Sequence, residues 1–243
     1  MDFLEFNDFF NTVMGCNGLS HLIDEEKSRK LYILMNHMLE VNKSMNLTAI
    51  KEEKAVILRH FVDSLTVEPF LPQNAKILDV GCGAGFPSLP LGIFRPDLQI
   101  TELDSTEKRI RYVKDTASML EIPHFTAIAA RAEELAHQIP HREQCDIVTA
   151  RAVAALPVLS ELCLPFVKQG GRFIAMKAKR GDEELAAARS AIAKLGGAVE
   201  KNLCITLQDE GEQDERQLIE IKKVGATPKE LPRAYAKIAK RPL

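Results

Sequence analysis

Strand-like runs alternate with helical stretches through the middle of the chain, and this alternation restricts the fold more than any other feature. The runs expected as strands lie at 76–80, 98–103, 124–130, 145–150 and 172–178. The main helical patterns lie between them at 106–120 and after them at 181–195. Strands and helices of this length predict βαβ units, because two parallel strands need a crossover connection that a helix normally provides. We therefore expect a parallel sheet.

The last part of the chain breaks this alternation. Two further strands are expected near 198–206 and 217–224, and a short polar segment separates them (Gln-Asp-Glu-Gly-Glu-Gln-Asp-Glu-Arg). That segment is too short for a crossover helix, so the two strands must pair antiparallel. An α/β fold with a seven-stranded, mostly parallel sheet and an antiparallel last strand resembles the Rossmann-like class I S-adenosylmethionine-dependent methyltransferases.

Three amphipathic helical patterns precede the first strand. In the second pattern Asp24 suits the N-cap position, and the third pattern runs from about 52 to 67 before two prolines end it. We expect residues 1–72 to form an N-terminal helical extension packed on the core. Residues 73–243 are expected to form the methyltransferase-like core and to end in a basic tail.

The composition and the cysteine pattern favour a cytoplasmic protein. The formal net charge is −2, and no run of about 18 apolar residues could span a membrane. The acidic N-terminus lacks the basic segment of a signal peptide. The five cysteines are scattered and form no C-x-x-C pair, which is typical of a reducing compartment with free thiols. We expect a cytoplasmic monomer with no metal site and no membrane contact.

Three alternating glycines follow the first strand, at Gly81, Gly83 and Gly85. Glycine lets the chain turn sharply and lets a ligand approach the backbone. Dinucleotide-binding loops have the spacing G-x-G-x-x-G, whereas here the third glycine comes one residue early and Phe86 follows it. This spacing favours an S-adenosylmethionine loop over a nicotinamide site. Glycines that serve only tight packing are the weaker interpretation, and Cys82 is read as a small filler.

Acidic residues at the next two strand ends suit the nucleoside part of such a cofactor. Asp104 could accept hydrogen bonds from both ribose hydroxyls. The alternative for Asp104 is an N-cap role, and Glu102 is a competing acid that strand alternation puts on the same face. After the third strand, the Ala132 N–H group and the Glu133 carboxylate suit the edge of adenine. The alternative for Glu133 is a first-turn acid that favours the helix dipole.

Basic side chains also follow strand ends. Arg151 could face the cofactor carboxylate, the target base or a phosphate, or could form an ordinary ion pair. The candidates for RNA phosphate contacts are Lys177, Lys179, Arg180, Arg233 and Lys240. Each of them is individually more typical of a solvated surface charge. The net charge of −2 indicates no general attraction to RNA, whereas residues 229–243 hold five Lys or Arg against one Glu. We therefore expect any RNA contact to be local.

Two sequence motifs of other methyltransferases are missing. The fourth strand ends in Ala150-Arg151-Ala152-Val153, where enzymes that methylate exocyclic amines have Asn/Asp-Pro-Pro-aromatic, and no Pro-Cys dipeptide supports covalent attack on a pyrimidine. Guanine N7 carries a free lone pair and no proton, so it needs neither device. We therefore assign no catalytic side chain. His60 and Asp63, one helical turn apart, are interpreted as a local pair.

Several motifs in order resemble the ribosomal RNA small-subunit methyltransferase G family (RsmG, also called GidB). They are the stretches 42–50, 60–65, 79–87, 103–109, 131–133, 150–153 and 241–243. Small departures from the family pattern are Cys82, Ser88 and the Leu231-Pro232-Arg233 stretch of the tail.

The resemblance implies transfer of a methyl group from S-adenosyl-L-methionine to N7 of one guanine in the 530 loop of 16S rRNA, guanine 527 in the standard rRNA numbering. It implies cofactor contacts at Gly81, Phe86, Ala132, Glu133 and Arg151. The expected partner is the small ribosomal subunit or its precursor. The alternatives are a small-molecule methyltransferase and a non-catalytic assembly factor that binds the same cofactor.

Overall fold

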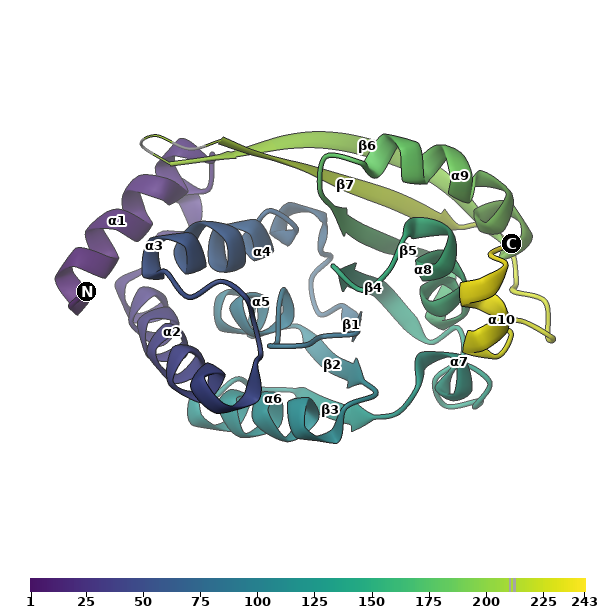
Figure 1. The fold of residues 1–243 in the computed structure, drawn as a ribbon, viewed down its shortest axis with the longest axis horizontal. Coiled ribbons are helices and arrows are strands. Elements are labelled where there is room, and N and C mark those ends of the chain that lie inside the picture. Colours follow the sequence, from purple (N-terminus) through teal and green to yellow (C-terminus); the bar gives the residue numbers. More distant parts are fainter. Residues whose placement is uncertain (210, 212) are drawn as a thin grey trace.

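A seven-stranded sheet runs through the middle of the protein (Figure 1). It is seen in a computed structural model that describes residues 1–209, 211 and 213–243. The strand order is β3-β2-β1-β4-β5-β7-β6. The strands are β1 (Lys76–Val80), β2 (Gln99–Asp104), β3 (Phe125–Ala129), β4 (Cys145–Arg151), β5 (Val167–Lys177), β6 (Gly197–Gln208) and β7 (Gln213–Lys223).

The direction of the strands confirms the predicted sheet. Strands β1 to β5 pair in parallel, whereas β7 lies between β5 and β6 and is antiparallel to both. In the parallel part, Asp79 at the end of β1 lies opposite Glu102 of β2 and Thr149 of β4. The carboxyl ends of the central strands therefore meet at one edge, where ligands of open α/β sheets bind.

Alternating side chains along the strands build a hydrophobic core on each face of the sheet. Ile77, Ile147 and Ile174 belong to one core, and their neighbours Leu78 and Val148 belong to the other. Strands that are buried on both faces need continuous apolar runs, which is the pattern that the sequence has here. Helices cover both faces: α5 (Ser88–Phe94), α6 (Glu107–Met119), α7 (Ala132–Leu135), α8 (Leu156–Cys163) and α9 (Gly181–Lys194).

The N-terminal helices share the core of the first face. They are α1 (Phe3–Cys16), α2 (Glu25–Met45), α3 (Glu53–Val56), a π-helical stretch at Ile57–Val62 and α4 (Asp63–Leu65). Phe6, Phe10 and Phe61 are fully buried there. Asp24 accepts a hydrogen bond from the backbone N–H of Lys27, as predicted for an N-cap. The extension is therefore packed on the sheet.

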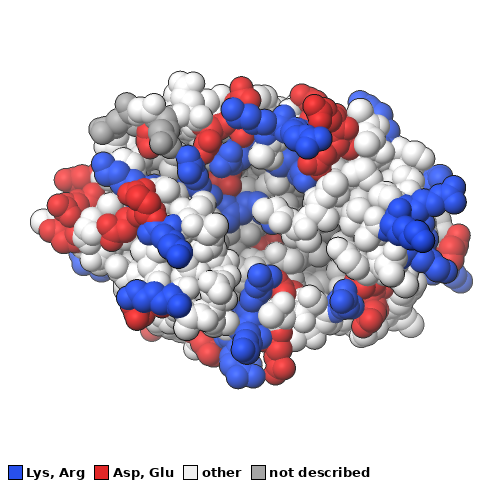
Figure 2. Space-filling view, in the orientation of Figure 1, with Lys and Arg blue, Asp and Glu red and all other residues white. Residues whose placement is uncertain are grey.

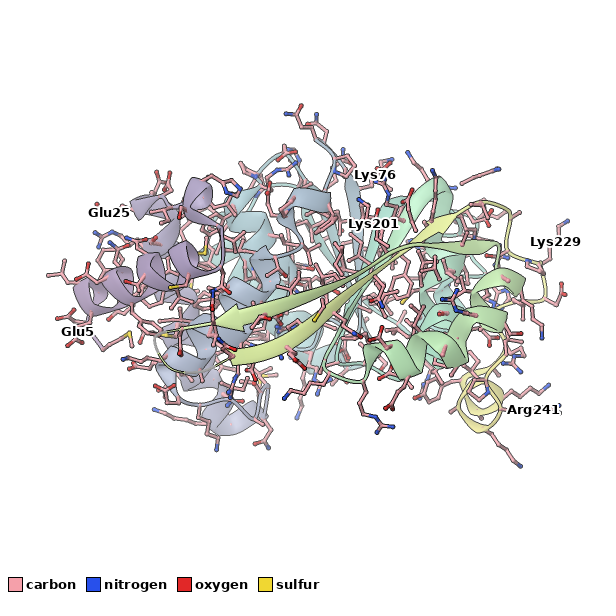
Figure 3. The ribbon with its side chains drawn as sticks, turned by 90° about the horizontal axis from the view of Figure 1, so that it is seen from above. Glu5, Glu25, Lys76, Lys201, Lys229 and Arg241 are labelled. Carbon is pink, nitrogen blue, oxygen red and sulfur yellow. The ribbon has the colours of Figure 1, made fainter. Side chains whose placement is uncertain are left out.

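The β6–β7 hairpin extends beyond the sheet to the N-terminal helices. From above, its two strands cross the molecule from the C-terminal half toward α1 (Figure 3). At its far end, Asn17 Oδ1 accepts from the backbone N–H of Gln208 at 3.1 Å, and Asn17 Nδ2 donates to the Gln208 carbonyl at 2.8 Å. A side-chain amide thus pairs with the backbone as a neighbouring strand would.

Two arginines fix the C-terminal segment, which ends in α10 (Tyr235–Lys240). The Arg142 guanidinium donates to the carbonyls of Leu231, Thr227 and Pro228, each at 2.9 Å. Arg233 donates from Nε and Nη2 to the two carboxylate oxygens of Glu161, at 2.8 and 2.6 Å, and the Glu161 side chain is fully buried. Arg233, a predicted RNA contact, therefore directs these two donors to the α8 carboxylate.

No helix in the described part of the chain is long and apolar enough to cross a membrane.

Replacing Arg233 by methionine tests the anchoring of the C-terminal segment. The Glu161 carboxylate would be left buried without its partner, so we expect the free energy of unfolding to fall by about 3 kcal/mol. Exposed Lys240 is the matched control, and Lys240→Met should change this free energy by no more than about 0.5 kcal/mol. Urea denaturation of both variants measures the difference. Equal effects of the two substitutions would show that the ion pair does not hold the segment.

Candidate active site

The glycine loop opens at the edge where the strands end. The backbone N–H of Gly81 donates to the Leu103 carbonyl at 2.7 Å, which ties the loop to β2. Gly85 has φ +87° and a Cβ there would lie 2.4 Å from Leu89 Cδ1, so packing alone demands glycine at this position. Gly83 has φ +59° and only a backbone oxygen within 4 Å of its ideal Cβ. The space beside Gly83 is open to a ligand.

A cavity of about 330 Å³ lies beside this loop. Four of the predicted cofactor residues line it: Gly81, Asp104, Ala132 and Glu133. The cavity also contacts Val153 and Tyr235, which the sequence did not single out. Tyr235 lies in the tail, more than 80 positions after Val153, so no local pattern signals its contribution. We call this space the first cavity.

Asp104 joins the glycine loop to the start of α6. Its carboxylate accepts from the backbone N–H of Gly83 at 3.3 Å and from that of Thr106 at 2.8 Å. The N-cap of α6 is Thr106, so the alternative N-cap role for Asp104 does not hold. The side chain is 5% exposed and lines the first cavity. A buried carboxylate here can brace the loop and accept from ligand hydroxyls.

Asp79 of β1 forms hydrogen bonds with neighbouring side chains in the interior. Asp79 is fully buried and accepts from Ser88 Oγ at 2.9 Å and Thr149 Oγ1 at 3.1 Å. Burial raises the pKa of Asp79 to about 7. Glu102 is also fully buried, and desolvation raises its pKa well above the usual range. Neither acid lines the first cavity. Glu102 shares a strand face with Asp104 but lies two residues further from the end of β2, inside the protein.

Arg131 and Glu133 form the far side of the first cavity. Glu133 is 8% exposed and lies 3.6 Å from an Arg131 nitrogen. Carboxylates and backbone N–H groups can bind the hydroxyl and amino groups of a nucleoside, and the cavity is of the size that small ligands occupy. Together with the open cradle at Gly83, these groups fit the adenosine part of the predicted S-adenosylmethionine.

Arg151 and Phe86 lie outside the first cavity. Arg151 lines a neighbouring cavity of about 630 Å³, called the second cavity, and Ala152 lines both. Nη1 of Arg151 donates to Asp63 Oδ2 and to the Arg59 carbonyl, both at 2.9 Å. Its guanidinium also lies 5.3 Å from the centre of the Phe86 ring. Of the predicted cofactor residues, Arg151 therefore lines only the second cavity, and Gly83 and Phe86 line neither.

His60 is a further hydrogen-bond partner of Arg151. Arginine can only donate, so at 3.1 Å from Arg151 Nη2 the Nδ1 atom of His60 must accept. The proton then sits on Nε2, which donates to Thr48 Oγ1 at 2.9 Å. The His60 ring stacks on Phe86 with centroids 4.5 Å apart and planes 7° apart. Burial and the Arg151 charge lower the pKa of His60 to about 3, so the ring is neutral.

These contacts revise the predicted pairing of His60 with Asp63. Both side chains bind Arg151, and no hydrogen bond between the two is recorded in the described part of the chain. The three-residue spacing on one helix face signalled their proximity but not their shared partner. The partner comes from β4, about 90 residues later, and sequence spacing carries no such information.

The predicted RNA-binding residues separate into two groups. Lys177, Lys179 and Arg180 line the second cavity, and Lys177 is largely buried against Glu184 at 2.7 Å. Lys240 lies on α10, and Arg241, which follows this helix, projects outward at the right-hand end of the view in Figure 3. In the space-filling view, Lys and Arg atoms lie around a central hollow and gather separately over α10 (Figure 2). In the parts described, no His, Cys, Asp and Glu cluster could hold a metal ion.

The pH dependence of stability tests the neutral state of His60. The pKa of His60 is lower in the folded protein than the ordinary histidine value of 6.5. The unfolded chain therefore binds a proton that the folded protein excludes. His60 contributes its full stability above about pH 6.5 and loses it as the pH falls toward the folded pKa.

We expect the wild-type free energy of unfolding to fall by about 2 kcal/mol more than that of His60→Asn between about pH 7 and pH 5. Urea denaturation at both pH values measures it. Exposed His124, whose φ of +51° asparagine tolerates, gives the control His124→Asn, which should keep the wild-type slope. A His60→Asn slope equal to the wild-type slope would contradict the buried neutral imidazole.

Comparison with known sequences extends the likeness over most of the chain. A family profile described as rRNA small subunit methyltransferase G (GidB) matches residues 27–218. Among similar proteins, Ribosomal RNA small subunit methyltransferase G of Limosilactobacillus reuteri is 47% identical over 96% of this chain and 98% of its own length. The protein of the same name from Clostridium botulinum is 39% identical over 97% and 99%.

Two solved structures share this fold at low sequence identity. The [4+2]-cyclase SpnF matches with a TM-score of 0.56 and 15% identity, over 80% of this chain and 94% of its own. Precorrin-6y C5,15-methyltransferase from Geobacter metallireducens matches with a TM-score of 0.51 and 15% identity, over 67% and 86%. These likenesses confirm the predicted class I fold. The family profile confirms the prediction of an S-adenosylmethionine-dependent methyltransferase. The chain belongs to the rRNA small subunit methyltransferase G family.

Proposed function

We propose that this protein transfers the methyl group of S-adenosyl-L-methionine to N7 of a guanine in the 530 loop of 16S rRNA, guanine 527 in the standard numbering. The observation that carries the proposal is the pair of adjoining cavities at the carboxyl edge of the sheet. The first cavity has two carboxylates, Asp104 and Glu133, beside two arginines. In the second cavity arginines and lysines outnumber the acids Asp63 and Glu184, and Ala152 lines both cavities. Family membership supports rRNA as the acceptor.

The first cavity suits the methyl donor. Asp104 would accept from the ribose hydroxyls while it braces Gly83, and Ala132 and Glu133 would meet the edge of adenine. The bound cofactor supplies an electrophilic methyl group. The residues of the chain bind and orient it, and the glycine loop keeps side chains away from it.

Methylation of N7 needs no general base. The N7 lone pair forms the new bond to the methyl carbon, the electrons of the broken S–C bond remain on sulfur, and no proton leaves the base. The acidic and thiol groups near the loop agree with this chemistry. Asp79 and Glu102 are buried outside both cavities, and burial raises the pKa of Cys82 far above its usual value. Proximity and alignment would supply the rate.

The small ribosomal subunit, or its precursor, is the partner that this proposal requires. Lys179 and Arg180 at the second cavity would contact phosphates near the acceptor base. Lys240 lies on α10, away from the cavity, and would contact a more distant part of the RNA. We place the protein in the cytoplasm and propose that it acts as a monomer.

Methyl transfer to ribosomal particles tests the function directly. Purified protein, labelled S-adenosylmethionine and either small-subunit particles or protein-free 16S rRNA from cells lacking this activity should give labelled RNA. Chemical cleavage at 7-methylguanosine followed by primer extension should locate the label in the 530 loop. Label at another atom or nucleotide, or transfer to small metabolites without RNA, would reject the proposal.

Removing the Asp104 carboxylate tests the cofactor site independently of RNA. Asp104→Ala loses acceptors for the ribose and for Gly83, so we expect S-adenosylhomocysteine to bind about 10- to 100-fold more weakly, as for lost hydrogen bonds to a charged group. Titration calorimetry measures this affinity. Asp115→Ala, an exposed change on α6, is the control and should bind as wild type does. Unchanged affinity of the Asp104 variant would remove this residue from the site.

A further inference from the structure

We propose that the second cavity is the pocket for the acceptor base, and that it receives a guanine extruded from the RNA whose O6 atom accepts from Arg216. This inference rests on the proposed function and assigns the residues that meet the acceptor. It adds a purine site to a cavity that the cofactor residues do not account for.

The position of the second cavity suits an acceptor. Arg151 ends β4, and the next residue, Ala152, lines both cavities. Ala152 has φ +57°, so the chain bends sharply at the wall that the two spaces share. A base in the second cavity would therefore lie beside a donor in the first. In-line transfer needs this arrangement, because the reacting atoms must approach to about 3–3.5 Å.

The walls of the second cavity suit a flat, polar ring. Ile50 and Met176 contribute apolar surface, and the cavity volume is about 630 Å³. Ile50 is held in place because its backbone N–H donates to Thr48 Oγ1 at 3.1 Å. Asn42 in turn binds the backbone of Thr48 through both its amide atoms, each at 2.9 Å. A base stacked against Ile50 would meet a fixed surface.

Arg216 has guanidinium hydrogens left for a ligand. Its Nε lies 3.4 Å from Asp63 Oδ1 and its Nη2 lies 3.6 Å from Asp214 Oδ2, both long for hydrogen bonds. One good hydrogen bond, at 3.0 Å, goes to the carbonyl of Glu215. Arginine carries five N–H donors. In contrast, Arg151 makes three contacts at 3.1 Å or less, so its guanidinium is more fully used.

A guanidinium donor selects guanine over adenine. Guanine presents the acceptors O6 and N7 side by side on one edge, whereas adenine presents an amino donor in place of O6. An arginine that binds O6 leaves the N7 lone pair free for the methyl group. A base inside a stack cannot enter a cavity of this kind, so it must be flipped out. Lys179 and Arg180 lie where the flanking phosphates would pass.

Substituting the acceptor base and Arg216 together tests this assignment. Small-subunit particles are reconstituted with 16S rRNA that carries guanine, inosine or 2-aminopurine at the methylated position. Inosine keeps O6 and N7, and 2-aminopurine keeps N7 but lacks O6. We expect wild-type single-turnover transfer to inosine to stay within a few-fold of guanine, and transfer to 2-aminopurine to fall about 30-fold.

The Arg216→Met variant should lose this discrimination. Its transfer to guanine should fall to the wild-type level for 2-aminopurine, with no further loss on 2-aminopurine itself. Its affinity for S-adenosylhomocysteine and its melting temperature should stay close to wild type, which separates the base contact from a folding defect. Arg189→Met, an exposed change on α9 away from the cavity, is the matched control and should behave as wild type on all three bases.

The fluorescence of 2-aminopurine gives a readout without methyl transfer. With S-adenosylhomocysteine bound, wild type should raise the fluorescence as the base leaves the stack, and Arg180→Met should weaken binding without changing the choice of base. Discrimination by Arg216→Met as strong as that of wild type would overturn the proposal. No wild-type transfer to guanine would instead reject the proposed function, and the fluorescence would still show whether the base enters the protein.

Discussion

The structure around the two cavities depends on the ion pair between Arg151 and Asp63. Arg151 ends a central strand, and Asp63 begins the last turn of the N-terminal helical segment, 88 residues earlier. Asp63 is buried, and a buried carboxylate without its cation would be costly. The pair therefore locks the extension against the carboxyl edge of the sheet. It also fixes a side chain that lines the second cavity, next to Ala152, which lines both cavities.

Further contacts hold the Arg151 side chain in one orientation. Neutral His60 accepts from one guanidinium nitrogen while Asp63 accepts from the other, and Phe86 lies under both His60 and Arg151. Three groups of different chemistry thus restrict one side chain. Such restriction lowers the entropy that Arg151 would lose on meeting a ligand. Because Phe86 directly follows the glycine loop, its contacts with His60 and Arg151 also hold the end of that loop in place.

The sequence predicted the fold well because its signals are local. Apolar runs, helical periodicity and a short polar connection define the order and direction of the strands, and each depends on neighbouring residues. The start of β5 was placed five residues late, at 172, where the structure begins it at Val167. Residues 168–170 are exposed and include Gly170, so they carry no strand-like apolar pattern. They lie where the pairing of β4 with β5 shifts its register, between the pairs Cys145–Val167 and Ile147–Arg172.

The site was predicted less completely because its partners are distant in sequence. Their location at strand ends correctly predicted that Asp104, Ala132 and Glu133 lie together, at one cavity. It could not show that Asp79 turns inward, that Arg233 pairs with Glu161, or that Arg216 and Tyr235 reach the two cavities. Those contacts depend on how the hairpin and the tail fold back. Loop and tail paths are set by tertiary packing, which spacing along the chain does not encode.

The two hydrogen bonds between the Asn17 side-chain amide and the Gln208 backbone affect the order in which the chain folds. The two residues are 191 positions apart, yet they exchange backbone-like hydrogen bonds. A chain that emerges from its N-terminus first must hold α1 without this partner until the hairpin has been synthesised. Contacts of such long range slow the search for the native state. The end of α1 therefore stays without this pair of hydrogen bonds until β6 has been synthesised.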